Sequence, residues 1–151
     1  MKLAEALQER ADLNRRIEEL KRRIANNILV QEGEMPAEDP AALLAELDSC
    51  IDRLERLVTA INTTNARTKV NRVTLTELIA KKDMLQLKIS AYRDAVYQAS
   101  MSTSRARGTE IRVKPLIQAS ELQKQVDLMS KELRETDNLL QETNWKTEVK
   151  L

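Results

Sequence analysis

Hydrophobic residues recur every three or four positions in four long segments of the chain. This spacing places the apolar side chains on one face of a helix, whereas a strand would alternate with a period of two. The four stripes are Leu3, Ala6, Leu13, Ile17, Leu20 and Ile24; Leu44, Leu47, Ile51, Leu54, Val58 and Ile61; Leu75, Leu78, Leu85, Ile89, Tyr92 and Val96; and Leu122, Val126, Met129, Leu133 and Leu140. The pattern predicts a chain built of amphipathic helices.

Signals for helix starts agree with the stripes. Asp39 offers a capping carboxylate just before Pro40, a residue favoured at the first helical position. Two further pairs have the spacing of capping boxes, in which two residues satisfy each other's backbone N–H groups: Thr74 with Glu77, and Ser120 with Gln123. We therefore predict helices near residues 2–29, 40–66, 75–100 and 120–145.

Composition supports the same fold class. A chain of 151 residues is expected to form a single helical domain, residues 1–151. Roughly half of the residues are Ala, Glu, Lys, Arg or Leu, as in long helices and coiled coils. With 2 glycines, 3 prolines and no phenylalanine, the core must consist mainly of aliphatic residues. We predict an all-α antiparallel four-helix bundle, or long coiled-coil-like helical hairpins, with a long loop between the third and fourth helices.

The charge balance narrows the range of partners and locations. The net charge is +1, from 25 basic and 24 acidic residues, which argues against general binding to nucleic acid or anionic membranes. No apolar run has the length of a membrane span, and the first residues lack the apolar core of a signal peptide. The single cysteine, Cys50, cannot form an intrachain disulfide and is expected to be a buried small hydrophobe. These features predict a cytoplasmic protein.

The absence of histidine removes the commonest general base and metal ligand. Di-metal helical bundles use a Glu-x-x-His pattern, which this chain therefore lacks. There is also no glycine-rich phosphate loop and no nucleophile–base pair. We predict no enzyme activity, no catalytic residues, no metal and no cofactor.

Polar residues interrupt the stripes where the second and fourth helices end. In an up-down bundle these two ends meet beside the start of the third helix. We therefore expect a polar end cluster formed by Asn62, Asn65, Lys82, Asn144 and Trp145. One interpretation is register specification, because a polar residue in a seam excludes slipped pairings. The alternative is a small polar ligand pocket.

The third predicted helix has a second apolar face. Ala80, Met84, Leu87 and Ala91 lie about half a turn from its main stripe. A helix that is apolar on two opposite faces is covered on both sides, and a two-fold self-packing surface is the commonest solution. We predict a homo-oligomer through this face. Scattered surface apolar residues are the alternative.

The connection at residues 101–119 is long and carries Arg105, Arg107, Arg112 and Lys114. In an up-down bundle it lies at the same end as the acidic connection at 30–39, so mutual charge compensation is one interpretation. A weak nucleic-acid site over residues 101–114 is the other. Alternating apolar residues from Ile111 onward leave open either a disordered crossover or an ordered arm that pairs with another subunit.

Several short stretches resemble a family of small bacterial helical proteins labelled septicolysin. They comprise residues 1–7, 10–13, 16–17, 30–34 and 36–40, together with Ile61-Asn62, Thr64-Asn65, Leu75-Thr76-Glu77, Asp83 and Asn144-Trp145. The resemblance implies a helical domain of unknown function with no known catalytic or binding residues. The family label implies a pore-forming lysin.

Taken together, these features predict a non-enzymatic, self-associating helical protein with a structural or interaction role, whose protein partner is unknown. The alternatives are a pore-forming lysin, a weak nucleic-acid binder using the basic connection, and an enzyme with a polar pocket at the bundle end.

Overall fold

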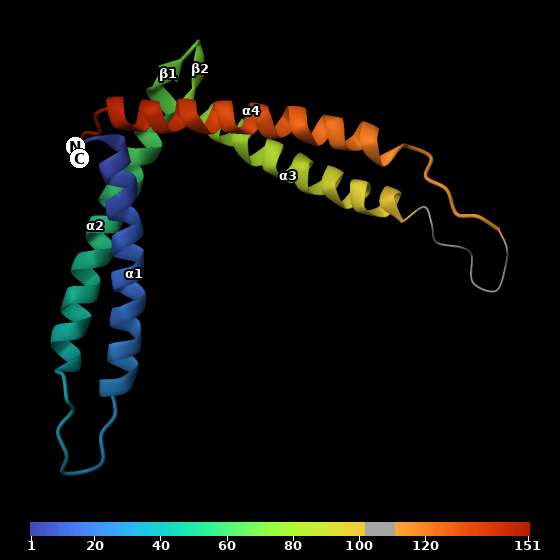
Figure 1. The fold of residues 1–151 in the computed structure, drawn as a ribbon. Coiled ribbons are helices and arrows are strands. Elements are labelled where there is room, and N and C mark those ends of the chain that lie inside the picture. Colours follow the sequence, from blue (N-terminus) through green and yellow to red (C-terminus); the bar gives the residue numbers. More distant parts are fainter. Residues whose placement is uncertain (102–110) are drawn as a thin grey trace. The chain divides into compact units, whose positions relative to one another are not determined.

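The structure is a computed structural model and describes residues 1–101 and 111–151. Its elements are α1 (Leu3–Asn27), α2 (Pro40–Arg67), β1 (Lys69–Val70), β2 (Val73–Thr74), α3 (Leu75–Ser100) and α4 (Ala119–Lys146) (Figure 1). The predicted all-α fold class is confirmed, and the helix ends differ from the predicted ones by at most two residues.

Contacts divide the chain into two compact units: unit 1 is Met1–Lys69 with Thr143–Leu151, and unit 2 is Val70–Glu142. The expectation of a single domain stays a prediction.

In unit 1, α1 and α2 form an antiparallel hairpin, side by side in Figure 1. The Asp39 carboxylate accepts a hydrogen bond from the Ala41 N–H at 3.0 Å, and Pro40 occupies the first turn, as the capping signal predicts. The buried apolar side chains of the two helices are Leu3, Ala6, Leu20, Leu43, Leu57 and Ile61. They form the apolar seam that holds the hairpin together.

One flank of this seam is closed by ion pairs spaced seven residues apart along α1. Glu9 pairs with Arg53 at 2.7 Å, and Arg16 Nε donates to Glu46 at 2.8 Å. The third pair of the row is Arg23 with Glu38. A spacing of seven returns to the same side of a helix that packs against a partner, so all three pairs lie along one edge of the hairpin.

The opposite flank of α2 is apolar and partly open. Leu44 and Ile51 are exposed, whereas Leu43 and Leu57 are buried. The predicted stripe of α2 therefore needs correction at these positions. The apolar band on this helix is wide, and the half of it that contains Leu43 and Leu57 is the one that packs against α1.

The end of α1 is tied to the following connection by Asn27. Its side-chain amide donates to the Arg23 carbonyl at 2.8 Å, and its oxygen accepts from the Glu38 N–H at 3.0 Å. This buried polar residue is thus paired on both sides, which removes the cost of burying it.

The residues after α4 pair with the first residues of the chain in unit 1. The Leu3 N–H donates to the Thr147 carbonyl and the Val149 N–H to the Met1 carbonyl, both at 2.8 Å. These bonds flank an antiparallel bridge between Lys2 and Glu148. Val149 is buried there, so the short segment also closes the end of the apolar seam.

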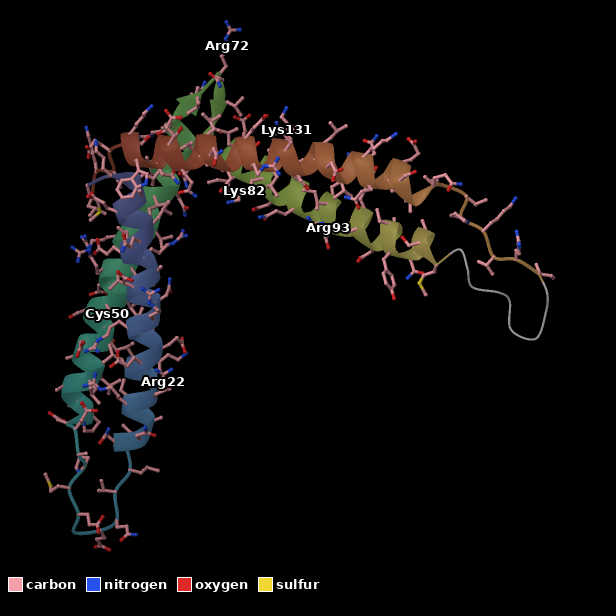
Figure 2. All side chains as sticks on the ribbon, viewed as in Figure 1. Arg22, Cys50, Arg72, Lys82, Arg93 and Lys131 are labelled. Carbon is pink, nitrogen blue, oxygen red and sulfur yellow. The ribbon has the colours of Figure 1, made fainter. Side chains whose placement is uncertain are left out.

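A tight β hairpin, which the sequence did not predict, connects α2 to α3. β1 and β2 are joined by Asn71 and Arg72, with φ values of 52° and 72°. Positive φ at both central residues is the conformation of the turn that matches the twist of paired strands. Arg72 extends from its tip (Figure 2).

In unit 2, α3 and α4 form a second hairpin, whose helices lie side by side in Figure 1. Thr74 and Glu77 form the predicted capping box, with Glu77 N–H to Thr74 Oγ1 at 3.2 Å and Thr74 N–H to the Glu77 carboxylate at 2.7 Å. Both predicted stripes are confirmed as the packed faces: Leu75, Leu78, Ile89, Val126, Met129, Thr136 and Leu140 are buried. Leu85, Tyr92, Val96 and Leu133 pack around Ile89.

Candidate functional site

The structure distributes the five residues of the predicted polar end cluster over both units. Asn62, Asn65, Asn144 and Trp145 belong to unit 1, and Lys82 belongs to unit 2. Asn65 and Asn144 are half-buried, whereas Asn62 and Trp145 are exposed. The indole of Trp145 is 59% exposed and therefore does not lie in the core of unit 1.

Lys82 interrupts the apolar seam of unit 2 and is neutralised there. Its ammonium donates to the Asp137 carboxylate at 2.5 Å, and this hydrogen bond lowers the pKa of Asp137. A lysine at a seam position is tolerated because the carboxylate lies at the edge of the facing helix. Lys82 thus has a structural partner in its own hairpin, which sequence spacing did not reveal.

The predicted oligomer face is exposed on α3. Met84 is 59% exposed and Leu87 is 64% exposed, and Ala80 and Ala91 are exposed as well. The packed side of the same helix carries Ile89, which is buried. Within unit 2, α3 therefore has an apolar surface on the side that does not pack on α4.

The predicted basic loop is only partly described. Arg105 and Arg107 lie outside the described residues. Arg112 and Lys114 are exposed in the segment that precedes α4, outside its helix. The nucleic-acid interpretation of this loop stays a prediction.

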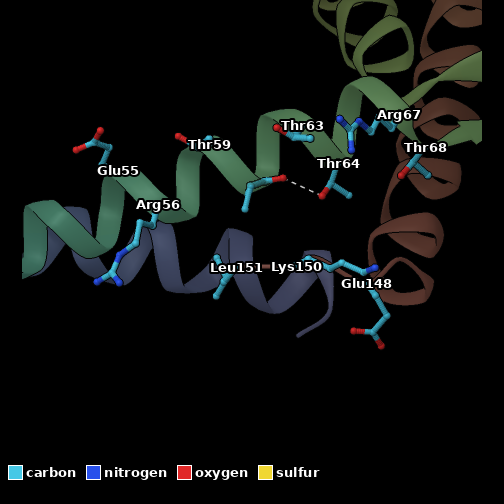
Figure 3. Close-up of a pocket in the computed structure, with 11 residues that line it drawn as sticks. Glu55, Arg56, Thr59, Thr63, Thr64, Arg67, Thr68, Glu148, Lys150 and Leu151 are labelled. Carbon is cyan, nitrogen blue, oxygen red and sulfur yellow. Dashed lines mark hydrogen bonds between the residues drawn. The ribbon is translucent and has the colours of Figure 1, made fainter.

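An open groove on unit 1 was not predicted from the sequence. It has a volume of about 580 Å³ and lies between the C-terminal half of α2 and the last residues of the chain (Figure 3). On the α2 side it is lined by Arg56, Thr59, Thr63, Arg67 and Thr68, and on the other side by Glu148, Lys150 and Leu151. We call it the α2 groove.

The α2 groove carries positively charged side chains that lack an ion-pair partner among the described residues. The Glu148 carboxylate is held by Lys2 Nζ at 2.5 Å, and this hydrogen bond is the main reason that its pKa is lowered. By contrast, Arg67 and Lys150 form no ion pair with any residue in the described ranges, and Arg56 bonds only to the Asp52 carbonyl, at 3.4 Å. Among the described residues, the cations Arg56, Arg67 and Lys150 therefore have no carboxylate partner, and the side chain of Glu55 lies unpaired on the α2 side of the groove.

A sequence signal for this groove existed but was ambiguous. Arg56, Thr59, Thr63 and Arg67 follow one another at intervals of three and four residues, so they share one face of α2. Such a polar face is normally solvated. Only the approach of Lys150, more than 80 positions away in the chain, turns the face into one wall of a groove.

The donors of the α2 groove suit the binding of an anionic group. Arginine and lysine side chains bind carboxylates, and threonine hydroxyls both donate and accept hydrogen bonds. The Thr64 hydroxyl is already used, because it donates to the Ala60 carbonyl at 2.8 Å.

No helix in the described part of the chain combines the length and apolar character that a membrane span requires.

Fold and surfaces together define an all-α protein made of antiparallel helical hairpins, with a cationic groove at one hairpin. Residues 10–149 match a family described as "Family of unknown function (DUF6847)", and the chain belongs to this family. It is also similar to a solved structure described as a functionally unknown conserved protein from Corynebacterium diphtheriae. That match has 36% identity, covers 99% of each chain and has a TM-score of 0.90. No curated protein matches the chain.

The resemblance to the septicolysin family is wrong. The family match extends over most of the chain and points to a different group, and the similar solved structure likewise carries no lysin description. Some of the short stretches behind the resemblance are helix starts, at residues 1–7, 36–40 and 75–77. Helix starts recur in unrelated helical proteins because the same residue types cap helices.

Proposed function

We propose that the protein is a non-enzymatic helical interaction protein that self-associates through the outer face of α3. The observation that carries the proposal is the exposure of Met84 and Leu87, at 59% and 64%, between two exposed alanines on one side of this helix. Apolar side chains at spacings of three and four present a continuous stripe that a second helix can cover. Covering it removes apolar area from water, at about 25 cal/mol per Å².

Charges beside this stripe favour a parallel arrangement of the two copies. Asp83 and Lys88 flank it on opposite sides and are both exposed. In a parallel pair of helices, a residue on one flank faces the residue five positions later on the partner, so each Asp83 meets a Lys88. An antiparallel pair would instead bring Lys81 of one copy beside Lys88 of the other.

The test replaces the apolar centre of the stripe. The double variant Met84→Glu/Leu87→Glu is expected to retain its helicity by circular dichroism, since both positions are exposed, but to sediment as a smaller species than the unmodified chain. The matched control is Leu128→Glu on α4, where the side chain is likewise 64% exposed. If the double variant and the unmodified chain have the same mass, the proposal is refuted.

A charge exchange tests the arrangement. Asp83→Lys alone and Lys88→Asp alone should each weaken the dimer about two- to fivefold, as expected for exposed ion pairs. The double variant should recover most of that loss because it restores opposite charges in the parallel pairing. If the loss of dimer affinity in the double variant equals the sum of the losses in the two single variants, parallel pairing is excluded. The proposal of self-association itself does not depend on this result.

A further inference from the structure

The segment that ends unit 1 has one free edge. In an antiparallel pair, alternate residues direct their N–H and C=O groups to opposite edges. The Thr147 carbonyl accepts from the Leu3 N–H, and the Val149 N–H donates to the Met1 carbonyl. The backbone N–H and C=O groups of Glu148 and Lys150 therefore point to the other edge, and they form no hydrogen bond within the described residues.

This free edge runs along the α2 groove. Glu148, Lys150 and Leu151 form the wall opposite α2, as Figure 3 shows. An unpaired strand edge is a template for another extended segment, because its backbone donors and acceptors are already aligned. The groove beside the edge supplies the space that an added segment needs.

We propose that the α2 groove binds an extended acidic peptide, which adds a strand to the edge formed by Glu148 and Lys150. The acidic character follows from the charges of the groove, where Arg56, Arg67 and Lys150 are free of carboxylate partners among the described residues. This inference does not depend on self-association, because the groove lies in unit 1 and the outer face of α3 in unit 2.

The dimensions agree with a short peptide. Arg56 and Arg67 are eleven positions apart on α2, which corresponds to about 16 Å along the helix axis. An extended chain of about five residues spans the same distance. Its backbone would bond Glu148 and Lys150, as in other cases of strand addition, while alternate acidic side chains reach the arginines across the groove.

The probe is the peptide acetyl-Thr-Glu-Thr-Glu-Thr-Glu-amide with a fluorescein label. Its binding to the protein is measured by fluorescence anisotropy at low salt. Its binding is compared with the glutamine version and with a version that is N-methylated at alternate residues. We expect both comparison peptides to bind about tenfold more weakly, the first because it lacks charge and the second because it cannot complete the backbone ladder. The proposal is overturned if the N-methylated peptide binds as tightly as the probe, since the interaction would then be purely electrostatic.

Variants of the protein separate charge from backbone pairing. Arg67→Gln and Lys150→Gln should each weaken binding of the probe several-fold, whereas Arg22→Gln, an exposed arginine on α1, should leave it unchanged (Figure 2). Lys150→Pro removes both the charge and the N–H that points to the groove, and it leaves the bond from the Val149 N–H to Met1 intact. It should therefore bind more weakly than Lys150→Gln. Equal binding by these two variants, or equal loss in Arg22→Gln, would refute the proposed site.

Discussion

The Glu9 carboxylate on α1 accepts two hydrogen bonds from the Arg53 guanidinium on α2, at 2.7 Å and 3.0 Å. The same flank carries Arg16 with Glu46, one heptad further along α1. Because both planar groups are held in one orientation, a bidentate pair defines how the two helices face each other more sharply than a single contact. The row of pairs therefore favours the rotation of α2 in which Leu57, rather than Ile51, packs against α1.

The Glu9–Arg53 pair is expected to give a measurable coupling. A double-mutant cycle with Glu9→Gln and Arg53→Gln, followed by urea unfolding at low salt, should yield about 0.5–1 kcal/mol, the range of partly exposed ion pairs. The value should fall at high salt because the charges are screened. A coupling of zero at low salt would show that the pair does not set the helix orientation.

The same pair predicts a dependence on pH. Its hydrogen bond to Arg53 lowers the pKa of Glu9 from the ordinary 4.5 in the folded state. The pair therefore stabilises the fold fully above pH 4.5, and this contribution is lost as the pH falls through the lowered pKa. The unmodified chain should lose more stability than Glu9→Gln between pH 5 and about pH 3. Parallel stability curves for the two proteins would contradict this assignment.

Substitution of two aliphatic residues on α2 by alanine is expected to lower the free energy of unfolding by very different amounts. Leu57 is fully buried, whereas Ile51 is 44% exposed. Leu57→Ala should lower the free energy of unfolding by about 2–4 kcal/mol, since it leaves a cavity in the seam. Ile51→Ala should cost less than about 1 kcal/mol, since only part of its surface leaves water. Chemical denaturation followed by circular dichroism measures both values, and the reverse order would contradict the observed register.

The segment after α4 should stabilise unit 1 through Val149. Val149→Ala removes two buried methyl groups and is expected to cost about 2 kcal/mol. It should also speed the exchange of the Leu3 amide, which donates to the Thr147 carbonyl. Lys150→Ala, at an exposed neighbouring position, serves as the control with little change in either quantity. Unchanged exchange of the Leu3 amide in Val149→Ala would show that the buried side chain does not hold the segment in place.

The β-hairpin turn offers a stabilising substitution. Arg72 has a φ of 72°, a conformation that costs a residue with a Cβ about 1 kcal/mol and glycine much less. Arg72→Gly should therefore raise the melting temperature by a few degrees. Arg72→Val should lower it, because a β-branched residue is most strained at positive φ. Equal melting temperatures for these two variants would argue against the turn conformation.

Local signals determined most of the fold. The capping residues Asp39 and Thr74 fix where α2 and α3 begin, because a side chain satisfies backbone N–H groups only a few residues away. In α3 and α4 the spacing of three and four identified the main stripes, which contain the buried residues Ile89 and Val126. The exposed Met84 and Leu87 also followed from the period, since they lie opposite that stripe.

Tertiary structure decided what local spacing cannot encode. On α2 the apolar band includes Leu43, Leu44, Ile51 and Leu57, and a band this wide leaves two rotations of the helix open. The rotation in the structure is the one that also pairs Arg53 with Glu9 of α1. The α2 groove required Lys150 to meet α2 through pairing with the first residues of the chain. Such long-range pairing leaves no periodic trace in the sequence, because it depends on backbone groups that every residue possesses.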